Sequence, residues 1–262
     1  MSEAKRLKIV VGTNCLTEVQ YPTYTNHCQF WFRLGRSYPD IDFICSHPAR
    51  MSIDRMRNMT AKVALEVDAD YVLFLDDDVI INPNYGLKQL LDCNADIAAG
   101  KVCVRGWPFN YMAFLHNPLL GGLEIQQDVP KTGIRDYDAV GFSFALVSTN
   151  ILRRMEEPYF VTGINNTEDI YFCVKARQID KKCSIRVNCD CECGHILWPE
   201  VLFEKNRQSY IKYFKEQNPE LAFIKTSDNK DRGSDYLAMV KTVTSHEEKT
   251  KNNKVESGMR KY

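Results

Sequence analysis

The sequence predicts an α/β protein built around an open, mostly parallel sheet. Strand-like apolar runs alternate with helical patterns through the first hundred residues, as in other folds of this class. The most apolar run, residues 71–75 (YVLFL), is continuous and rich in β formers, which indicates a central strand covered on both faces. It ends abruptly in Asp76, Asp77 and Asp78. Because ligands of open α/β sheets bind beyond the carboxyl ends of the strands, we expect this acidic triplet to mark the functional site.

The elements of the first half follow from local patterns. Strands are expected where short runs of β-branched and aromatic residues lie between turn signals, at residues 7–12, 41–45, 71–75 and 96–104. Helices are expected where apolar residues recur at helical spacing, around residues 27–34, from a cap at Ser52 to about residue 67, and at 85–93. This order of strand and helix is the basis of the predicted sheet.

The second half is more mixed. A hairpin or loop region is expected at residues 106–138, then strands at 139–148 and 184–188, and helices starting at 151, 167 and 204. Gly141 lies inside the first of these strands. Thr167 is a suitable helix cap, with Glu168 and Asp169 in the first turn. Beyond residue 226 the apolar content falls, and we expect a polar, partly flexible tail.

The composition limits the function classes. The 262 residues carry 34 Lys and Arg against 34 Asp and Glu, so no overall basic field exists to attract nucleic acid or an anionic membrane. No apolar run approaches the roughly 20 residues of a membrane-spanning helix, and the N-terminus lacks the apolar stretch of a signal peptide. We therefore expect a cytoplasmic protein, in the host cytoplasm if it is viral.

Three of the ten cysteines are grouped. Cys189, Cys191 and Cys193 alternate with acidic residues, and in a regular strand all three thiols would point to one face. The favoured interpretation is a buried strand with reduced thiols, because zinc sites usually use wider spacings. A non-enzymatic zinc-binding interaction module using these cysteines remains an alternative.

The acidic triplet points to a divalent cation. Adjacent carboxylates repel one another, and a hard metal ion with oxygen ligands would relieve the repulsion. Mg²⁺ and Mn²⁺ favour one or two carboxylates together with substrate phosphates, so the expected site is a metal–diphosphate site. The alternative is a solvated acidic turn.

Other polar residues fit such a site but have ordinary explanations. Glu168 and Asp169 resemble a common helix start, and His195 is either a third metal ligand or a structural histidine. Arg50 and Arg57 would flank a diphosphate at helical spacing, because a guanidinium grips phosphate with a planar fork. Solvated charges on a helix face are the alternative.

The order of these motifs resembles the GT-A glycosyltransferases. The similarity is greatest to glycosyltransferase family 2 and to small stand-alone members from phages and large DNA viruses. The matching segments cover most of residues 7–200 and lie at 55–65, 71–83, 139–148, 165–182 and 193–196. The resemblance implies a Rossmann-like sandwich over residues 1–205, with a nucleotide-sugar half to about residue 105, an acceptor half after it, and a helical extension and tail at 206–262.

The resemblance also implies roles for individual residues. Asp78 and His195 would bind Mn²⁺ or Mg²⁺, and Asp76 would contact the metal through water or the nucleotide ribose. The other nucleotide-sugar contacts would come from Thr13, Arg50, Arg57, Asn58, Asp77 and Gly141. Asp169 would be the general base that takes the proton of the acceptor hydroxyl, with Glu168 in support. Arg105, Trp107 and Trp198 are placed on the acceptor side.

The implied activity is transfer of a sugar from a nucleoside-diphosphate sugar, with UDP favoured, to an acceptor hydroxyl with inversion. The acceptor is a glycan, a protein or a hydroxymethylated base in viral DNA. The segment at residues 14–24 departs from the family pattern. The chain also lacks the Q-x-x-R-W motif of processive members, which argues against polymer synthesis. A nucleotidyltransferase is disfavoured because the turn after the first strand lacks the Gly-rich, basic loop that it would need.

Overall fold

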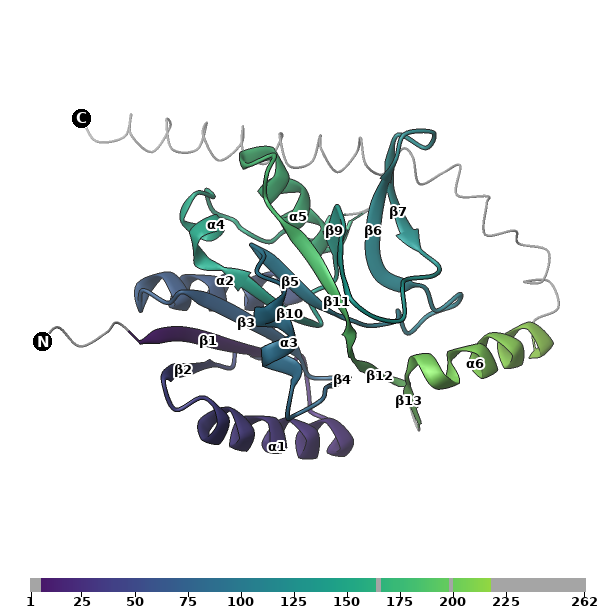
Figure 1. Ribbon diagram of the computed structural model, residues 1–262, viewed down its shortest axis with the longest axis horizontal. Coiled ribbons are helices and arrows are strands. Elements are labelled where there is room, and N and C mark those ends of the chain that lie inside the picture. The colour runs from purple at the N-terminus through teal and green to yellow at the C-terminus, as the bar shows by residue number, and fades with distance from the viewer. Residues whose placement is uncertain (1–5, 164–165, 198–199, 218–262) are drawn as a thin grey trace, which may run out of the picture.

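The computed structural model describes residues 6–163, 166–197 and 200–217, and its core is one twisted sheet (Figure 1). Within these ranges the sheet has seven strands in the order β2-β1-β3-β10-β5-β11-β8. Their bounds are β1 Leu7–Asn14, β2 Ile41–Ser46, β3 Tyr71–Asp76, β5 Ile97–Lys101, β8 Ile134–Asp136, β10 Phe144–Ser148 and β11 Ile185–Glu192. β1 pairs in parallel with β2 and β3, and β5 with β11, whereas β10 and β8 run antiparallel to their neighbours. The predicted mostly parallel sheet is confirmed.

Helices cover both faces of this sheet (Figure 1). α1 (Tyr21–Ser37) and α3 (Gly86–Asp92) pack on one face, where Phe30, Leu34 and Leu87 meet buried strand residues. The other face carries α2 (Ile53–Glu66), α4 (Thr149–Arg153) and α5 (Glu168–Ile179). β3 is apolar on both faces for this reason, with residues 72–75 fully buried.

Two small sheets flank the carboxyl edge of the central sheet. One consists of β4 (Val79–Ile80), β12 (Gly194–Leu197) and β13 (Glu200–Leu202), and the other of β6 (Tyr111–Asn117), β7 (Gly122–Gln126) and β9 (Ala139–Val140). In the first sheet His195 lies opposite Val79, the residue after the acidic triplet. This pairing brings two segments more than one hundred residues apart to the end of β3.

The single strand expected at residues 139–148 is wrong. The chain forms β9 in a small sheet and β10 in the central sheet, because residues 141–143 cross between the two. Both halves of the crossing are anchored. The N–H of Gly141 donates to the carbonyl of Met112 at 2.9 Å, and the carbonyl of Ser143 accepts from Asp76 at 2.9 Å.

The common face expected for the three cysteines is also wrong. Pairing between β11 and β5 shifts register between Asn188 and Glu192, and such an irregularity re-aims the side chains along the strand. Cys189 consequently packs with the α5 side of the core, whereas Cys191 and Cys193 pack with the α1 and α3 side.

The last described helix, α6 (Glu204–Gln217), packs on the loop before β6. Trp107 stacks on Phe214 with ring centroids 6.2 Å apart, and Phe109 lies 5.3 Å from the same ring. Arg207 is buried and its Nε donates to the carbonyl of Phe109 at 2.6 Å. The boundary expected after residue 205 falls inside α6, which forms a hydrophobic cluster of its own with the loop before β6. The division of the chain into these parts stays a prediction. No helix in the described part of the chain is long and apolar enough to cross a membrane.

Candidate functional site

The three carboxylates after β3 diverge to different partners. Asp76 lies 3.1 Å from the Nη2 of Arg57, and Asp77 forms a hydrogen bond with the thiol of Cys15. Asp78 lies 2.8 Å from the Nη1 of Arg105. Burial raises the pKa of Asp77, although the bond from Cys15 opposes that rise. The three carboxylates thus have separate neighbours, and the charges of Asp78 and Asp76 still add to the raised pKa of Asp77. The metal contact expected for Asp76 stays a prediction.

Asp78 and His195 converge as the sequence predicted. The Nε2 of His195 is 3.5 Å from the Oδ1 of Asp78, and its Nδ1 is 2.8 Å from the carbonyl oxygen of Cys103. A carbonyl only accepts, so Nδ1 carries the hydrogen and Nε2 is left as the ligating atom. Burial alone would raise the pKa of Asp78, but His195 and Arg105 outweigh it and lower that pKa.

The pair is suited to a cation. In a neutral imidazole the Nε2 lone pair faces the Oδ1 of Asp78, while the nearby cation, Arg105, contacts the other oxygen of that carboxylate. A divalent ion between Nε2 and Oδ1 would bind both acceptors, and the carbonyl behind Nδ1 is the usual outer partner of a metal-bound histidine. Among the described residues no three His, Cys, Asp or Glu side chains gather into a metal site. Asp78 and His195 would therefore supply two ligands, and phosphate and water the rest.

Arg57 occupies a buried position between the two halves of the site. Only 2% of its surface is exposed, and its guanidinium lies 3.1 Å from Asp76 and 3.0 Å from Glu168. It also lies over the rings of Phe74 and Phe142, at 5.8 and 5.6 Å. Arg57 thus links the end of β3 to the start of α5, and the diphosphate contact expected from the sequence stays a prediction.

Asn58 and Arg50 differ from expectation. The side-chain amide of Asn58 donates to the carbonyls of Asp54 and Phe160 and accepts from the N–H groups of Tyr159 and Phe160. It fixes the segment before α5 and has no hydrogen bond to spare for a nucleotide. Arg50 precedes α2 in a left-handed conformation (φ 59°), so it does not share a helix face with Arg57. It is exposed beside Cys15, near the end of β1.

The end of β1 contributes buried polar groups. The Oγ1 of Thr13 and the Oδ1 of Asn14 are buried and have no hydrogen-bond partner among the described residues. The Nδ2 of Asn14 reaches Asp76 at 3.5 Å. Thr13 thus lies at the edge predicted for it, one strand away from the acidic triplet.

Glu168 and Asp169 start α5 and are both buried. The Oδ1 of Asp169 accepts from the N–H of Ile170 at 2.8 Å and from the hydroxyl of Thr167. Desolvation raises the pKa of Glu168 to about 7, because the opposing charge of Arg57 only partly offsets burial and the nearby charge of Asp169. Thr167 precedes the helix as predicted, but its side chain serves Asp169 rather than a backbone N–H.

Three remaining predicted residues have close neighbours. A Cβ at Gly141 would lie 2.9 Å from the Cβ of Met112, so this glycine allows a close approach of the neighbouring strand. Trp107 is half-buried against α6, and Arg105 contacts Asp78. The sugar and acceptor contacts expected for these residues stay predictions. Trp198 lies outside the described residues.

The cysteine tract does not fit a zinc site. Its three thiols are buried and divided between the two faces of the sheet.

Sequence reasoning missed how deeply Arg57 is buried. A signal exists, because Arg57 lies three, four and seven residues before Thr60, Ala61 and Ala64, which form the buried face of α2. The contact of Cys15 with Asp77 and the carbonyl of Cys103 behind His195 had no local signal, since each depends on pairing between distant strands.

Comparison with solved structures supports the fold. A197 from STIV superposes with a TM-score of 0.53 at 16% identity, over 76% of this chain and 91% of that chain. GalNAc-T7, solved with UDP, GalNAc and Mn²⁺, gives 0.44 at 11% identity, over 91% of this chain and 55% of that one. The inositol-1-phosphate CTP transferase from T. maritima gives 0.39 at 11% identity, over 82% and 98%. No protein-family profile and no curated protein sequence matches the chain.

The likeness to A197, together with the mostly parallel sheet, confirms the predicted Rossmann-like, GT-A-like fold. The two scores below 0.5 add nothing to this assignment. Membership in glycosyltransferase family 2 stays a prediction.

Proposed function

We propose that this protein is a metal-dependent glycosyltransferase that moves a sugar from a nucleoside-diphosphate sugar to an acceptor hydroxyl. The observation that carries the proposal is the convergence of Asp78 and His195 at the carboxyl end of β3. Open α/β sheets bind their ligands at this edge. The preference for a UDP-sugar rests on the sequence resemblance alone.

Asp78 and His195 would hold Mn²⁺ or Mg²⁺, with Nε2 of the imidazole and a carboxylate oxygen as ligands. A bound divalent ion would stabilise the negative charge that develops on the leaving nucleoside diphosphate. Arg105 contacts Asp78 while its side chain is more than half exposed, so it is free to turn outward. In that position it would bind the phosphates, which is a different role from the acceptor contact expected from the sequence.

Asp169 would act as the general base on the acceptor hydroxyl. Its Oδ1 is fixed by Thr167 and the N–H of Ile170, which orients the carboxylate. Proton removal by a positioned carboxylate contributes on the order of 10²–10⁴-fold to the rate. Glu168 and Asp76 are held on either side of Arg57, so this buried arginine fixes the distance between the acceptor side and the nucleotide side. Attack opposite the leaving group would give inversion.

The test is metal-dependent release of nucleotide from a panel of UDP-, GDP-, TDP- and CMP-sugars. Asp78→Asn is expected to abolish release and the thermal stabilisation by Mn²⁺ plus donor, whereas Asp169→Asn is expected to abolish transfer but retain donor binding. Asp92→Asn is the matched control, because Asp92 is an exposed carboxylate paired only with Lys88 on α3. Unchanged stabilisation in Asp78→Asn would remove the basis of the proposal.

The same assay can identify the class of acceptor. Added glycan, protein or hydroxymethylated DNA should accelerate nucleotide release when it is the acceptor. A DNA acceptor should also lose affinity steeply with salt, because phosphate contacts release counterions. The neutral net charge of the chain favours the glycan or protein acceptor over DNA.

A further inference from the structure

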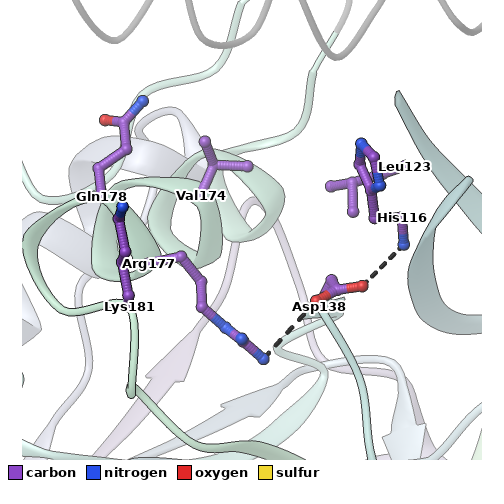
Figure 2. A pocket seen from close by; sticks show the side chains of 7 residues that line it. All are labelled: His116, Leu123, Asp138, Val174, Arg177, Gln178 and Lys181. Atoms are coloured by element: carbon purple, nitrogen blue, oxygen red, sulfur yellow. Dashed lines mark hydrogen bonds and ion pairs between the residues drawn. The ribbon is translucent and has the colours of Figure 1, made fainter. Parts of the chain in front are cut away.

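A second cavity lies between the C-terminal half of α5 and the β6–β7 hairpin (Figure 2). Its volume is about 460 Å³, within the range of small-molecule pockets. Val174, Arg177 and Lys181 line one side, and His116 and Leu123 line the other. Asp169 and Arg177 are eight residues apart on one helix, or about 12 Å along its axis. The cavity is therefore separate from the site at the end of β3.

Arg177 lines this cavity with a side chain that is one-third exposed. Its Nη2 donates to the carbonyl of Tyr137 at 2.9 Å and lies 3.7 Å from Asp138. Its Nε is buried and has no hydrogen-bond partner among the described residues. Figure 2 shows the guanidinium extending from α5 toward Asp138 at the floor of the cavity. Because Nε is shielded, a ligand with an acceptor oxygen would meet the exposed part of the side chain, which is one third of it.

The charge of the lining favours an anion. Arg177 and Lys181 are positive, and Asp138 is the one acidic residue among the described lining residues. One oxygen of Asp138 accepts the N–H of His116 at 2.7 Å, and the other faces Arg177. Asp138 is thus occupied in holding the hairpin and orienting Arg177, while Lys181 is exposed at the rim. The charges of Arg177, Lys181 and Asp138 therefore sum to +1.

The rest of the lining is apolar. Val174 is buried on α5, and Leu123 is half-buried on β7 across the cavity. A purely ionic ligand would leave the exposed part of Leu123 uncovered, whereas an apolar body beside the anionic group would cover it. We propose that this cavity binds a small molecule carrying a carboxylate or phosphate on an apolar body. This site is independent of the glycosyltransferase proposal.

The test is an NMR titration of the full chain with phenyl phosphate, benzoate and the neutral benzyl alcohol. At least one anion is expected to give saturable amide shifts at Leu123 and Val174, and benzyl alcohol is expected to bind more weakly. The two anions distinguish a phosphate from a carboxylate ligand. Lys181→Ala is expected to weaken binding by about fivefold, as is Arg177→Lys, which keeps the charge but removes the planar guanidinium.

Lys182→Ala is the matched control, because Lys182 is the exposed neighbour of Lys181 and does not line the cavity. It should leave the affinity within about twofold. The proposal is overturned if no anion saturates these shifts, if benzyl alcohol binds as tightly, or if Lys182→Ala weakens binding as much as Lys181→Ala. Thermal unfolding of each variant confirms that it is folded, and none of these readouts requires transferase activity.

Discussion

Replacing Glu168 by glutamine isolates the electrostatics at the start of α5. Glu168 is 6% exposed, and desolvation raises its pKa from 4.5 to about 7. The folded protein therefore binds this proton more tightly than the unfolded chain does. The stability contributed by the protonated carboxyl is fully present below pH 4.5 and is lost as the pH rises through 7. Glutamine keeps the shape of the side chain and cannot ionise.

The magnitude follows from the two pKa values. At 1.36 kcal/mol per unit, ionisation of Glu168 lowers the free energy of unfolding by roughly 2–3 kcal/mol between pH 5 and pH 8. Titrating groups remote from Glu168 are the same in both proteins and cancel in the difference, whereas Asp169 and Asp76 interact with it and contribute to the measured change. The stability of Glu168→Gln relative to the natural chain should thus rise by roughly 2–3 kcal/mol over this range.

The assay is urea unfolding followed by circular dichroism at half-unit steps from pH 5 to pH 8. Glu66→Gln, at an exposed glutamate near the end of α2, is the control and should change stability by less than about 0.5 kcal/mol throughout. Parallel curves for Glu168→Gln and the natural chain would mean that Glu168 is ionised over the whole range. That result would refute the electrostatic description of the site.

Three further substitutions test the other contacts. Arg57→Gln leaves Asp76 and Glu168 without their shared cation, so the free energy of unfolding measured in urea should fall by about 3 kcal/mol. Arg55→Gln, at an exposed position of the same helix, is the control and should change it by less than about 0.5 kcal/mol. Arg105→Gln removes a competitor for Asp78 and should strengthen Mn²⁺ binding to the donor-free protein by about threefold in calorimetry, so weaker binding would contradict the pairing. Gly141→Ala places a methyl group against Met112 and should destabilise by about 1–3 kcal/mol. Met112→Ala in the same chain should recover part of that lost stability. If it recovers none, contact with the Met112 side chain is not the cause of the destabilisation.

The sequence by itself determined most of the elements and the edge of the sheet that carries the candidate site. The continuous apolar run of β3 and the acidic triplet after it are local features, so periodicity and turn signals located them correctly. The same holds for α5, whose cap and two acidic residues were predicted at the right positions. These features depend on a few consecutive side chains, which is the range over which local patterns are informative.

The tertiary structure alone decided which side chains meet. Asp78 reaches His195 because β4 pairs with β12, and Arg57 is buried because α2 lies between the end of β3 and the start of α5. The split of residues 139–148 and the bulge beside Cys191 likewise follow from pairing with distant strands. A hydrogen-bonded register between remote segments leaves no periodic signal in either one. For this reason the direction of each carboxylate, and the partner that neutralises it, could be read only from the folded chain.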